Sequence, residues 1–207
     1  GSAGGAADLD TTLGTLVATN ATSGNIVVQE TSGLIIGGTG VRTLAGNGNI
    51  TVDVVAGALD VNSVVTAQGA GNVTLNAGGL LTANALISST TGNLSLTGGT
   101  GVTHTAAGDL TTGGVGTINV TATANDLTMA DGTVYTAGSG TVTLLAAGNV
   151  VLGELTTTSS ALNVTATAGA ITDTTAAETA NLTTSGTATL SAATGIGSAG
   201  GAADLDT

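Results

Sequence analysis

Apolar and polar residues alternate with a period of two in short stretches that recur along the whole chain. The stretches read NIVV at 25, NITV at 49, NVTL at 72, NLSL at 93, TINV at 117, TVTL at 141, ALNV at 161 and TATL at 187. Successive stretches lie 20 to 26 residues apart. Because side chains alternate between the two faces of a strand, the pattern predicts one short β-strand in each repeat.

Two more aliphatic positions follow each stretch and predict a second and a third strand. The second strand carries Leu34, Leu59, Leu81, Val102, Leu127, Val150, Ile171 and Ile196. The third, less regular strand carries Val41, Val65, Ile87, Leu110, Val134 and Leu155. Three short strands repeated at this spacing are typical of the coil of a parallel β-helix. We therefore expect an all-β fold, a parallel β-helix or solenoid of about eight coils, with aliphatic side chains filling its interior from three sides.

The composition fits this fold and excludes several functions. The chain has 35 Gly and no Pro, Cys, Trp or Phe. Glycine suits corners with positive φ, whereas proline cannot donate the hydrogen bonds that stack each coil on the next. Arg42 is the single basic residue against 13 acidic ones, a net charge of −12, which argues against binding to nucleic acid or anionic membranes. Apolar runs are too short for membrane insertion.

A long repeat encloses the short one. The segment GSAGGAADLDT occupies residues 1–11 and recurs unchanged at residues 197–207, an offset of 196. We interpret residues 1–207 as a single β-helical repeat segment, one 196-residue period plus an 11-residue overlap, within a longer tandem array. We expect residues 197–207 together with 1–24 to form an irregular coil or an inserted loop. We expect an inserted loop near residues 200–203 there, in preference to an extra strand carrying Leu16 and Ala18.

His104 is the only imidazole and stands in register with Ala83 and Met129. A general base needs a partner carboxylate and a nucleophile within reach. The nearest acid at the equivalent position is Asp173, three coils away. We therefore expect a buried strand residue, no catalytic residue and no enzymatic activity.

Two acidic pairs in the irregular segment are weak candidates for calcium ligands: Asp8 with Asp10, and their copies Asp204 and Asp206. Calcium takes six to eight oxygen ligands. The segments GGTGVRT and GGTGVTH have the glycines of calcium-binding β-rolls but lack their acids. Solvated acids that keep the rod soluble are the interpretation we favour, and we expect no cofactor.

The outward positions beside the first strand form two polar columns, a candidate binding or packing face. Such arrays resemble the faces of ice-binding proteins, although threonine is also an ordinary solvent-facing strand residue. Asparagines at one phase of the coil predict a structural ladder in preference to glycosylation sites. The columns comprise Asn49, Thr51, Asn72, Thr74, Asn93, Ser95, Thr117, Asn119, Thr141, Thr143, Thr187 and Thr189.

Segments such as GNVTLNAGG, GTINVTATANDLTMADG and LGTLVATNATSGNIVV resemble the β-strand repeats of very large bacterial surface proteins, similar to filamentous haemagglutinin-like and autotransporter adhesins. The resemblance implies export to the cell surface, a right-handed β-helical shaft and no catalytic residue. We expect a structural repeat of a giant extracellular fibre, sheath or adhesin stalk that associates with itself end to end and laterally. The alternatives are a Thr/Asn face that binds ice or another ligand, and an adhesin that contacts host or neighbouring cells.

Overall fold

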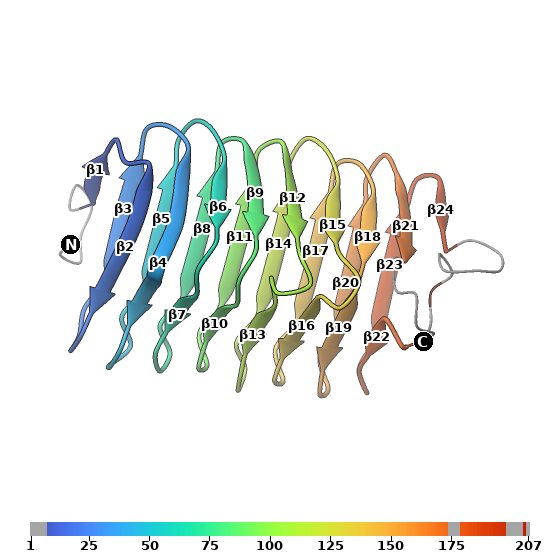
Figure 1. Cartoon of the computed structure of the whole chain (residues 1–207). Coiled ribbons are helices and arrows are strands. Elements are labelled where there is room, and N and C mark those ends of the chain that lie inside the picture. Colours follow the sequence, from blue (N-terminus) through green and yellow to red (C-terminus); the bar gives the residue numbers. More distant parts are fainter. Residues whose placement is uncertain (1–7, 174–178, 198–204, 206–207) are drawn as a thin grey trace.

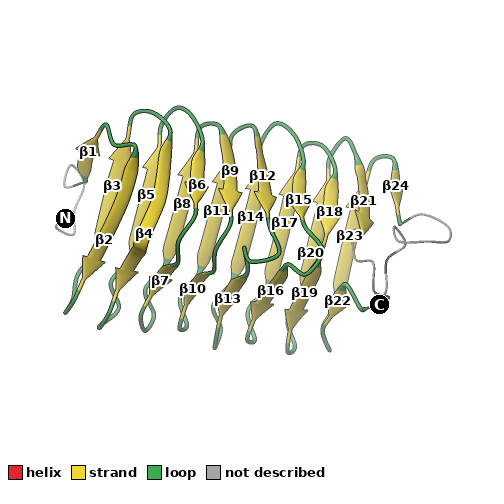
Figure 2. Ribbon diagram, viewed as in Figure 1, coloured by secondary structure: helices red, strands yellow, loops and turns green. Residues whose placement is uncertain are grey.

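The chain folds into an elongated parallel β-solenoid of about eight turns, in a computed structural model that describes residues 8–173, 179–197 and 205. The coils stack along one axis, with β1 at one end and β24 at the other (Figure 1). The described residues contain strands, turns and bends and no helix (Figure 2). The all-β parallel solenoid expected from the sequence is confirmed.

The first strands of successive coils form one sheet of nine parallel strands, which lies along one side of the solenoid. Each strand hydrogen-bonds to the equivalent strand of the coils before and after it, so the sheet grows along the axis. Its members, in spatial order, are β1 (Leu9–Thr11), β3 (Ile26–Glu30), β5 (Ile50–Val54), β8 (Val73–Ala77), β11 (Leu94–Gly98), β14 (Ile118–Ala122), β17 (Val142–Ala146), β20 (Leu162–Ala166) and β23 (Ala188–Ala192).

The second and third strands of the coils join into one sheet of fifteen strands, so the solenoid has two sheets. Strand β4 (Leu34–Thr43) runs through both columns and pairs with β6 through its first half and with β7 through its second. The second column continues with β6 (Leu59–Val61), β9 (Leu80–Ala83), β12 (Gly101–His104), β15 (Leu127–Met129), β18 (Val150–Leu152), β21 (Ala170–Asp173) and β24 (Gly195–Ile196). The third column continues with β7 (Val65–Ala67), β10 (Ile87–Ser89), β13 (Leu110–Thr112), β16 (Val134–Ala137), β19 (Glu154–Thr157) and β22 (Leu182–Thr183).

Each coil from β5 to β22 therefore contains three strands. The expectation that side chains fill the interior from three sides is wrong, because the strands form two sheets and not three. The chain of β4 does not break between the two columns, because Ile36 to Val41 continues as strand through three glycines. That one strand joins the columns into a single sheet opposite the first.

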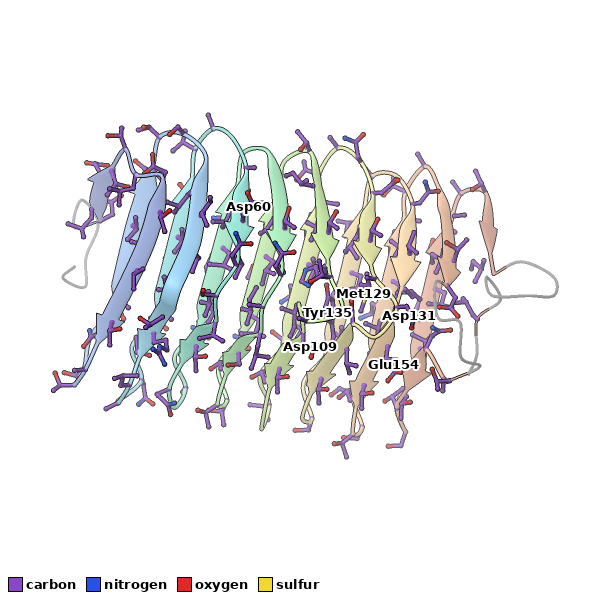
Figure 3. All side chains as sticks on the ribbon, in the orientation of Figure 1. Asp60, Asp109, Met129, Asp131, Tyr135 and Glu154 are labelled. Carbon is purple, nitrogen blue, oxygen red and sulfur yellow. The ribbon has the colours of Figure 1, made fainter. Side chains whose placement is uncertain are left out.

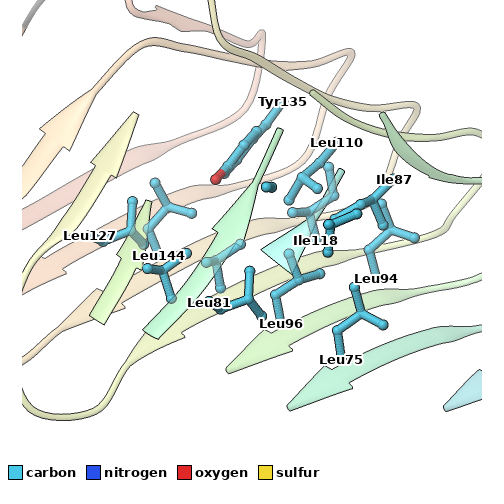
Figure 4. Close-up of a cluster of buried hydrophobic side chains, with 14 of the residues drawn as sticks. Leu75, Leu81, Ile87, Leu94, Leu96, Leu110, Ile118, Leu127, Tyr135 and Leu144 are labelled. Atoms are coloured by element: carbon cyan, nitrogen blue, oxygen red, sulfur yellow. The ribbon is translucent and has the colours of Figure 1, made fainter. Parts of the chain in front are cut away.

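The interior is a set of aliphatic columns, as the alternation predicts. Along β5, β8, β11, β17 and β20 the first, third and fifth residues are buried and the second and fourth are not. Each fully buried aliphatic side chain contributes roughly 1.5 to 3 kcal/mol. Figure 4 shows leucine and isoleucine side chains from several coils meeting in this core, with Tyr135 among them.

One inward position was assigned wrongly from the sequence. Leu110 pairs with Tyr135, and Tyr135 pairs with Leu155, so the tyrosine and not Val134 occupies the inward column. Tyr135 is fully buried, whereas Val134 is only partly buried. The backbone N–H of Val134 donates to Asp109 Oδ1 at 2.8 Å, and Val134 is the first residue of β16, one position before the inward Tyr135.

Glycine at the corners has two distinct causes. Gly57 has φ 99°, a conformation that residues with a side chain rarely adopt. Gly92 has no such φ, but a Cβ atom there would collide with the carbonyl oxygen of Gly71 in the coil beside it. The sequence predicts glycine for positive φ, and close stacking of the corners is the second reason.

The described residues 8–24 of the irregular segment contain two strands, β1 and β2. β2 (Thr15–Asn20) carries Leu16 and Ala18 and pairs in parallel with β4, with a register shift between these two residues. Residues 200–203, where the sequence predicts an inserted loop, lie outside the described residues.

Candidate binding and packing face

The outward residues of the nine-stranded sheet form a straight column, as expected from the sequence. Pairing within the sheet places each outward residue beside the equivalent residue of the next coil. These residues are therefore spaced by the separation of neighbouring strands, about 4.8 Å. The column contains Val27, Thr51, Thr74, Ser95, Asn119, Thr143, Asn163 and Thr189. All of these side chains are partly or largely exposed.

The asparagines of the second predicted column have a different role, because their side chains bind the backbone of the next coil. Asn49 N–H donates to Asn25 Oδ1 at 2.9 Å, and Asn72 N–H donates to Asn49 Oδ1 at 2.8 Å. Asn93 N–H donates to Asn72 Oδ1 at 2.8 Å, and Thr117 N–H donates to Asn93 Oδ1 at 2.9 Å. The structural asparagine ladder predicted from the sequence is thereby confirmed for this run.

The asparagine side chains accept hydrogen bonds from backbone N–H groups that have no acceptor within the β-sheet. In the same corner the backbone carbonyl of Asn72 accepts from Ile50 N–H at 2.8 Å, which continues the sheet ladder. The N–H of Asn72 lies just before its strand begins, and the Asn49 side chain supplies its acceptor. Backbone N–H groups without an acceptor destabilise a fold, so the ladder strengthens the contact between coils.

The same hydrogen bond recurs at the other corners with aspartate or asparagine. Asn149 N–H donates to Asp126 Oδ1 at 2.7 Å, and Ala170 N–H donates to Asn149 Oδ1 at 2.9 Å, before the second strand. The Val134–Asp109 bond described above is its counterpart before the third strand. A short carboxylate or amide immediately before a strand therefore links the coils at all three corners.

Buried hydroxyls line the corner between the third and first strands, which the sequence analysis did not predict. Ser89 Oγ donates to Gly71 O and Thr112 Oγ1 donates to Gly92 O, each at 2.6 Å. Thr157 Oγ1 donates to Gly140 O at 2.9 Å at the equivalent corner. The sequence feature that could have predicted these hydroxyls is the recurrence of small or hydroxyl residues at this inward position: Ala67, Ser89, Thr112, Ala137 and Thr157.

His104 and Tyr135 interrupt the aliphatic interior in the central coils. His104 pairs with Ala83 and Met129, the register expected from the sequence, and is fully buried. Its Nδ1 lies 2.6 Å from Gly108 O, and because a carbonyl only accepts, Nδ1 carries the hydrogen. Burial lowers the pKa of His104 to about 4, against the opposing effect of the Gly108 hydrogen bond, so the ring is neutral at pH 7.

Tyr135 lies in the central coils (Figure 3) and projects from β16 into the core beside Leu110 (Figure 4). Its ring also contacts that of His104. Its hydroxyl and Nε2 of His104 are buried without a hydrogen-bond partner. Burial, and secondarily the charge of Asp109, raises the pKa of Tyr135 well above its usual 10. Both rings are therefore neutral at pH 7, enclosed in the core and packed against each other.

Glu30 anchors the coil at the start of the solenoid and was also missed from the sequence. Its side chain is inaccessible to solvent, and its carboxylate accepts from Leu13 N–H at 2.6 Å and Thr11 Oγ1 at 2.7 Å. Ser32 N–H and Oγ each donate at 3.2 Å. Burial raises the pKa of Glu30, but these four hydrogen bonds outweigh it and lower the pKa to about 2.

The acidic pair of the irregular segment is only partly described. Asp10 lies exposed on β1, paired with Gln29, and Asp8 is partly exposed just before it. Their copies Asp204 and Asp206 lie outside the described residues. Among the residues that the structure describes, no three acidic, histidine or cysteine side chains gather as metal ligands would.

Searches for similar proteins returned no matching family model, no matching curated protein and no matching solved structure. In the described part of the chain, no helix is long and apolar enough to cross a membrane.

Proposed function

We propose that this chain is a rod-forming structural unit of an extracellular fibre, sheath or adhesin stalk, without enzymatic activity. The observation that carries the proposal is the unbroken register of nine parallel strands from Leu9 to Ala192, combined with the identity of residues 1–11 and 197–207. A solenoid whose coils all share one axis extends in proportion to its number of repeats. The resemblance to large bacterial surface proteins supports a location outside the cell.

The chemistry of the coil suits a load-bearing element. Each coil is linked to the next by sheet hydrogen bonds, by the side chains that precede the strands and by hydroxyls at the corners. The buried hydroxyls of Ser89, Thr112 and Thr157 serve these links, which supports a structural role for the coil.

Lateral association is the second part of the proposal. From β8 to β23 the outward side chains of the nine-stranded sheet carry no charge. Short threonine, serine and asparagine side chains allow two such sheets to approach closely, and few charges oppose the approach. We propose that rods pack side by side through this face into a bundle or sheath.

A ligand-binding face is the alternative, and the regular column of Thr51, Thr74 and Thr143 favours it. The neighbouring asparagines, however, use their carbonyl oxygens within the solenoid. If the face bound ice, the protein would show thermal hysteresis that Thr143→Lys abolishes.

The experiment is electron microscopy of cells that produce the protein, with gold-labelled antibodies against residues 1–207. The proposal expects label along extended surface fibres or sheaths, and the Thr143→Lys variant should give separate rods where the native chain gives bundles. Label confined to the cell interior, or to globular particles, would contradict the structural role. Isolated rods in the native material would contradict lateral packing alone.

A further inference from the structure

The two ends of the solenoid each leave inward-facing leucine or isoleucine side chains uncovered. Leu9 pairs with Val28 of the inward column and is 61% exposed, whereas Val28 is 2% exposed. At the other end Ile196 continues the column of Ile171 and is 48% exposed, while Ile171 is fully buried. Among the described strands, β1 and β23 each end the first sheet with one edge that has no neighbouring strand, and the core positions beside these edges could accept a further strand.

The end that carries β1 is hollow. A cavity of about 400 Å³ opens there. Apolar groups of Leu9, Leu16, Ile26 and Val28 contribute to its wall. Ile26 is only partly buried, although its partner Ile50 in the next coil is fully buried. The hollow is thus the unfinished interior of the solenoid.

The sequence identifies the occupant. Leu205 is the copy of Leu9, because residues 197–207 repeat residues 1–11. Leu205 is partly buried and packs against the hydrophobic core, as do Leu190 and Ala192 of β23. The copy of the residue that begins β1 is therefore in contact with the core of the unit that precedes it in the array.

From this we infer that a second copy of the chain, the preceding unit of the array, fills the hollow, with β1 of each unit seated on β23 of the unit before it and Leu9 over Leu190. This inference rests on the proposed rod. The inward column then reads Val164, Leu190, Leu9, Val28 and Val52 without interruption. In the other sheet, the same arrangement places Gly14 of one unit opposite Ile196 of the unit before it. Gly14 precedes Thr15, which pairs with Ile35, so it stands in the same column as Leu34 and Ile196.

The length of chain at the junction agrees with this register. Leu205 follows Ile196 by nine positions, a stretch that spans at most about 30 Å when extended. That is enough to cross between the two sheets, which lie about 10 Å apart, but not to build a third strand as well. A short crossing suffices because β1 pairs with only the last three residues of β3, Val28 to Glu30.

The length that each unit adds to the rod depends on whether β1 stacks on β23. With β1 on β23, each unit contributes nine strands to the first sheet and advances the rod by about 43 Å. If β3 stacked directly on β23 and β1 were displaced, eight strands would give about 38 Å.

The test uses a two-unit chain, residues 1–207 followed directly by residues 12–207. Ser191 and Asp206, the copy of Asp10, become neighbours on the outward face, so Ser191→Cys with Asp206→Cys should oxidise to a disulfide. The matched control is Thr189→Cys with Asp206→Cys, whose residues lie two positions apart along the strand, about 7 to 8 Å, and should react about tenfold more slowly. The chain has no native cysteine to interfere.

The rise per unit, measured by cryo-electron microscopy of longer arrays without cysteines, completes the test. A rise of about 43 Å with preferential Ser191–Asp206 coupling supports the register. A rise of about 38 Å, or faster coupling of the Thr189 pair, overturns the register and leaves the rod intact. Units that do not share an axis overturn the proposed rod itself.

Discussion

The imidazole ring of His104 lies edge-on to the phenol ring of Tyr135, with 5.1 Å between the ring centroids and 66° between the ring planes. The two residues come from adjacent coils, on β12 and β16, and both are completely buried. Edge-to-face contact is a favourable arrangement for aromatic rings. This contact replaces aliphatic stacking at the one place where the core contains rings.

Acid should destabilise the protein through His104. Its pKa is about 4 in the fold and 6.5 for the unperturbed side chain, so the unfolded state takes up a proton first. The free energy of unfolding is therefore unaffected by His104 above pH 6.5 and falls as the pH is lowered towards 4, by about 3 kcal/mol. Denaturant unfolding at pH 7, 5.5 and 4 measures this loss.

His104→Leu is the control, because leucine fills the site without titrating. The difference in stability between the native chain and this variant should change with pH between 6.5 and 4, which separates the histidine from the carboxylates. Equal pH dependence in both proteins would show that His104 does not cause it.

Removing the hydroxyl of Tyr135 should stabilise the fold. The hydroxyl is buried without a hydrogen-bond partner, so Tyr135→Phe removes an uncompensated desolvation cost and should raise the free energy of unfolding by about 1 kcal/mol. Thermal unfolding followed by circular dichroism checks the direction. A lower melting temperature in the variant would mean that the hydroxyl is bonded, and the account of this site would be wrong.

The asparagine ladder should tolerate aspartate but not alanine. Asn72→Ala leaves Asn93 N–H without its acceptor and should cost about 1 kcal/mol, whereas Asn72→Asp keeps an oxygen at the same place, as Asp126 does for Asn149. Asn119→Ala, at an exposed outward position, serves as a surface control. The prediction fails if alanine and aspartate at position 72 destabilise the protein equally in denaturant unfolding at pH 7.

The first coil should open in acid before the others. The pKa of Glu30 is about 2 in the fold against 4.5 for the free side chain, so its contribution is complete above pH 4.5 and is lost as the pH falls through 2. Hydrogen exchange at Leu13 and Ser32, both held by this carboxylate, should accelerate over that interval relative to Val52 in the core. Glu30→Gln should show fast exchange at Leu13 already at pH 7.

The sequence predicts the fold well because the solenoid depends on a local rule repeated many times. Alternation placed Ile50, Val73 and Leu94 inside, and the ladder pairs them as expected. One coil departed from the rule at Val134, whose N–H binds Asp109 at the start of β16, while the next residue, Tyr135, takes the inward position. Periodicity alone contains no information about that bond.

The polar features were less predictable, for a physical reason. Asn49 and Thr51 look alike in the sequence as outward polar residues. In the structure, the Asn49 side chain accepts a hydrogen bond from the backbone of Asn72, whereas Thr51 is a partly exposed residue of the outward column. The number of sheets depended on whether β4 continues through its glycines, and the burial of Glu30 depended on donors from Thr11 and Leu13 in the irregular segment. These outcomes arise from contacts between coils, which a single repeat does not reveal.

The most direct test of the rod is small-angle X-ray scattering of chains that contain one, two and three units. The rod predicts a constant cross-sectional radius and a maximum dimension that increases by about 40 Å with each unit. A maximum dimension that stays nearly constant while the cross-section grows would contradict it, because the units would then fold against one another instead of continuing one solenoid.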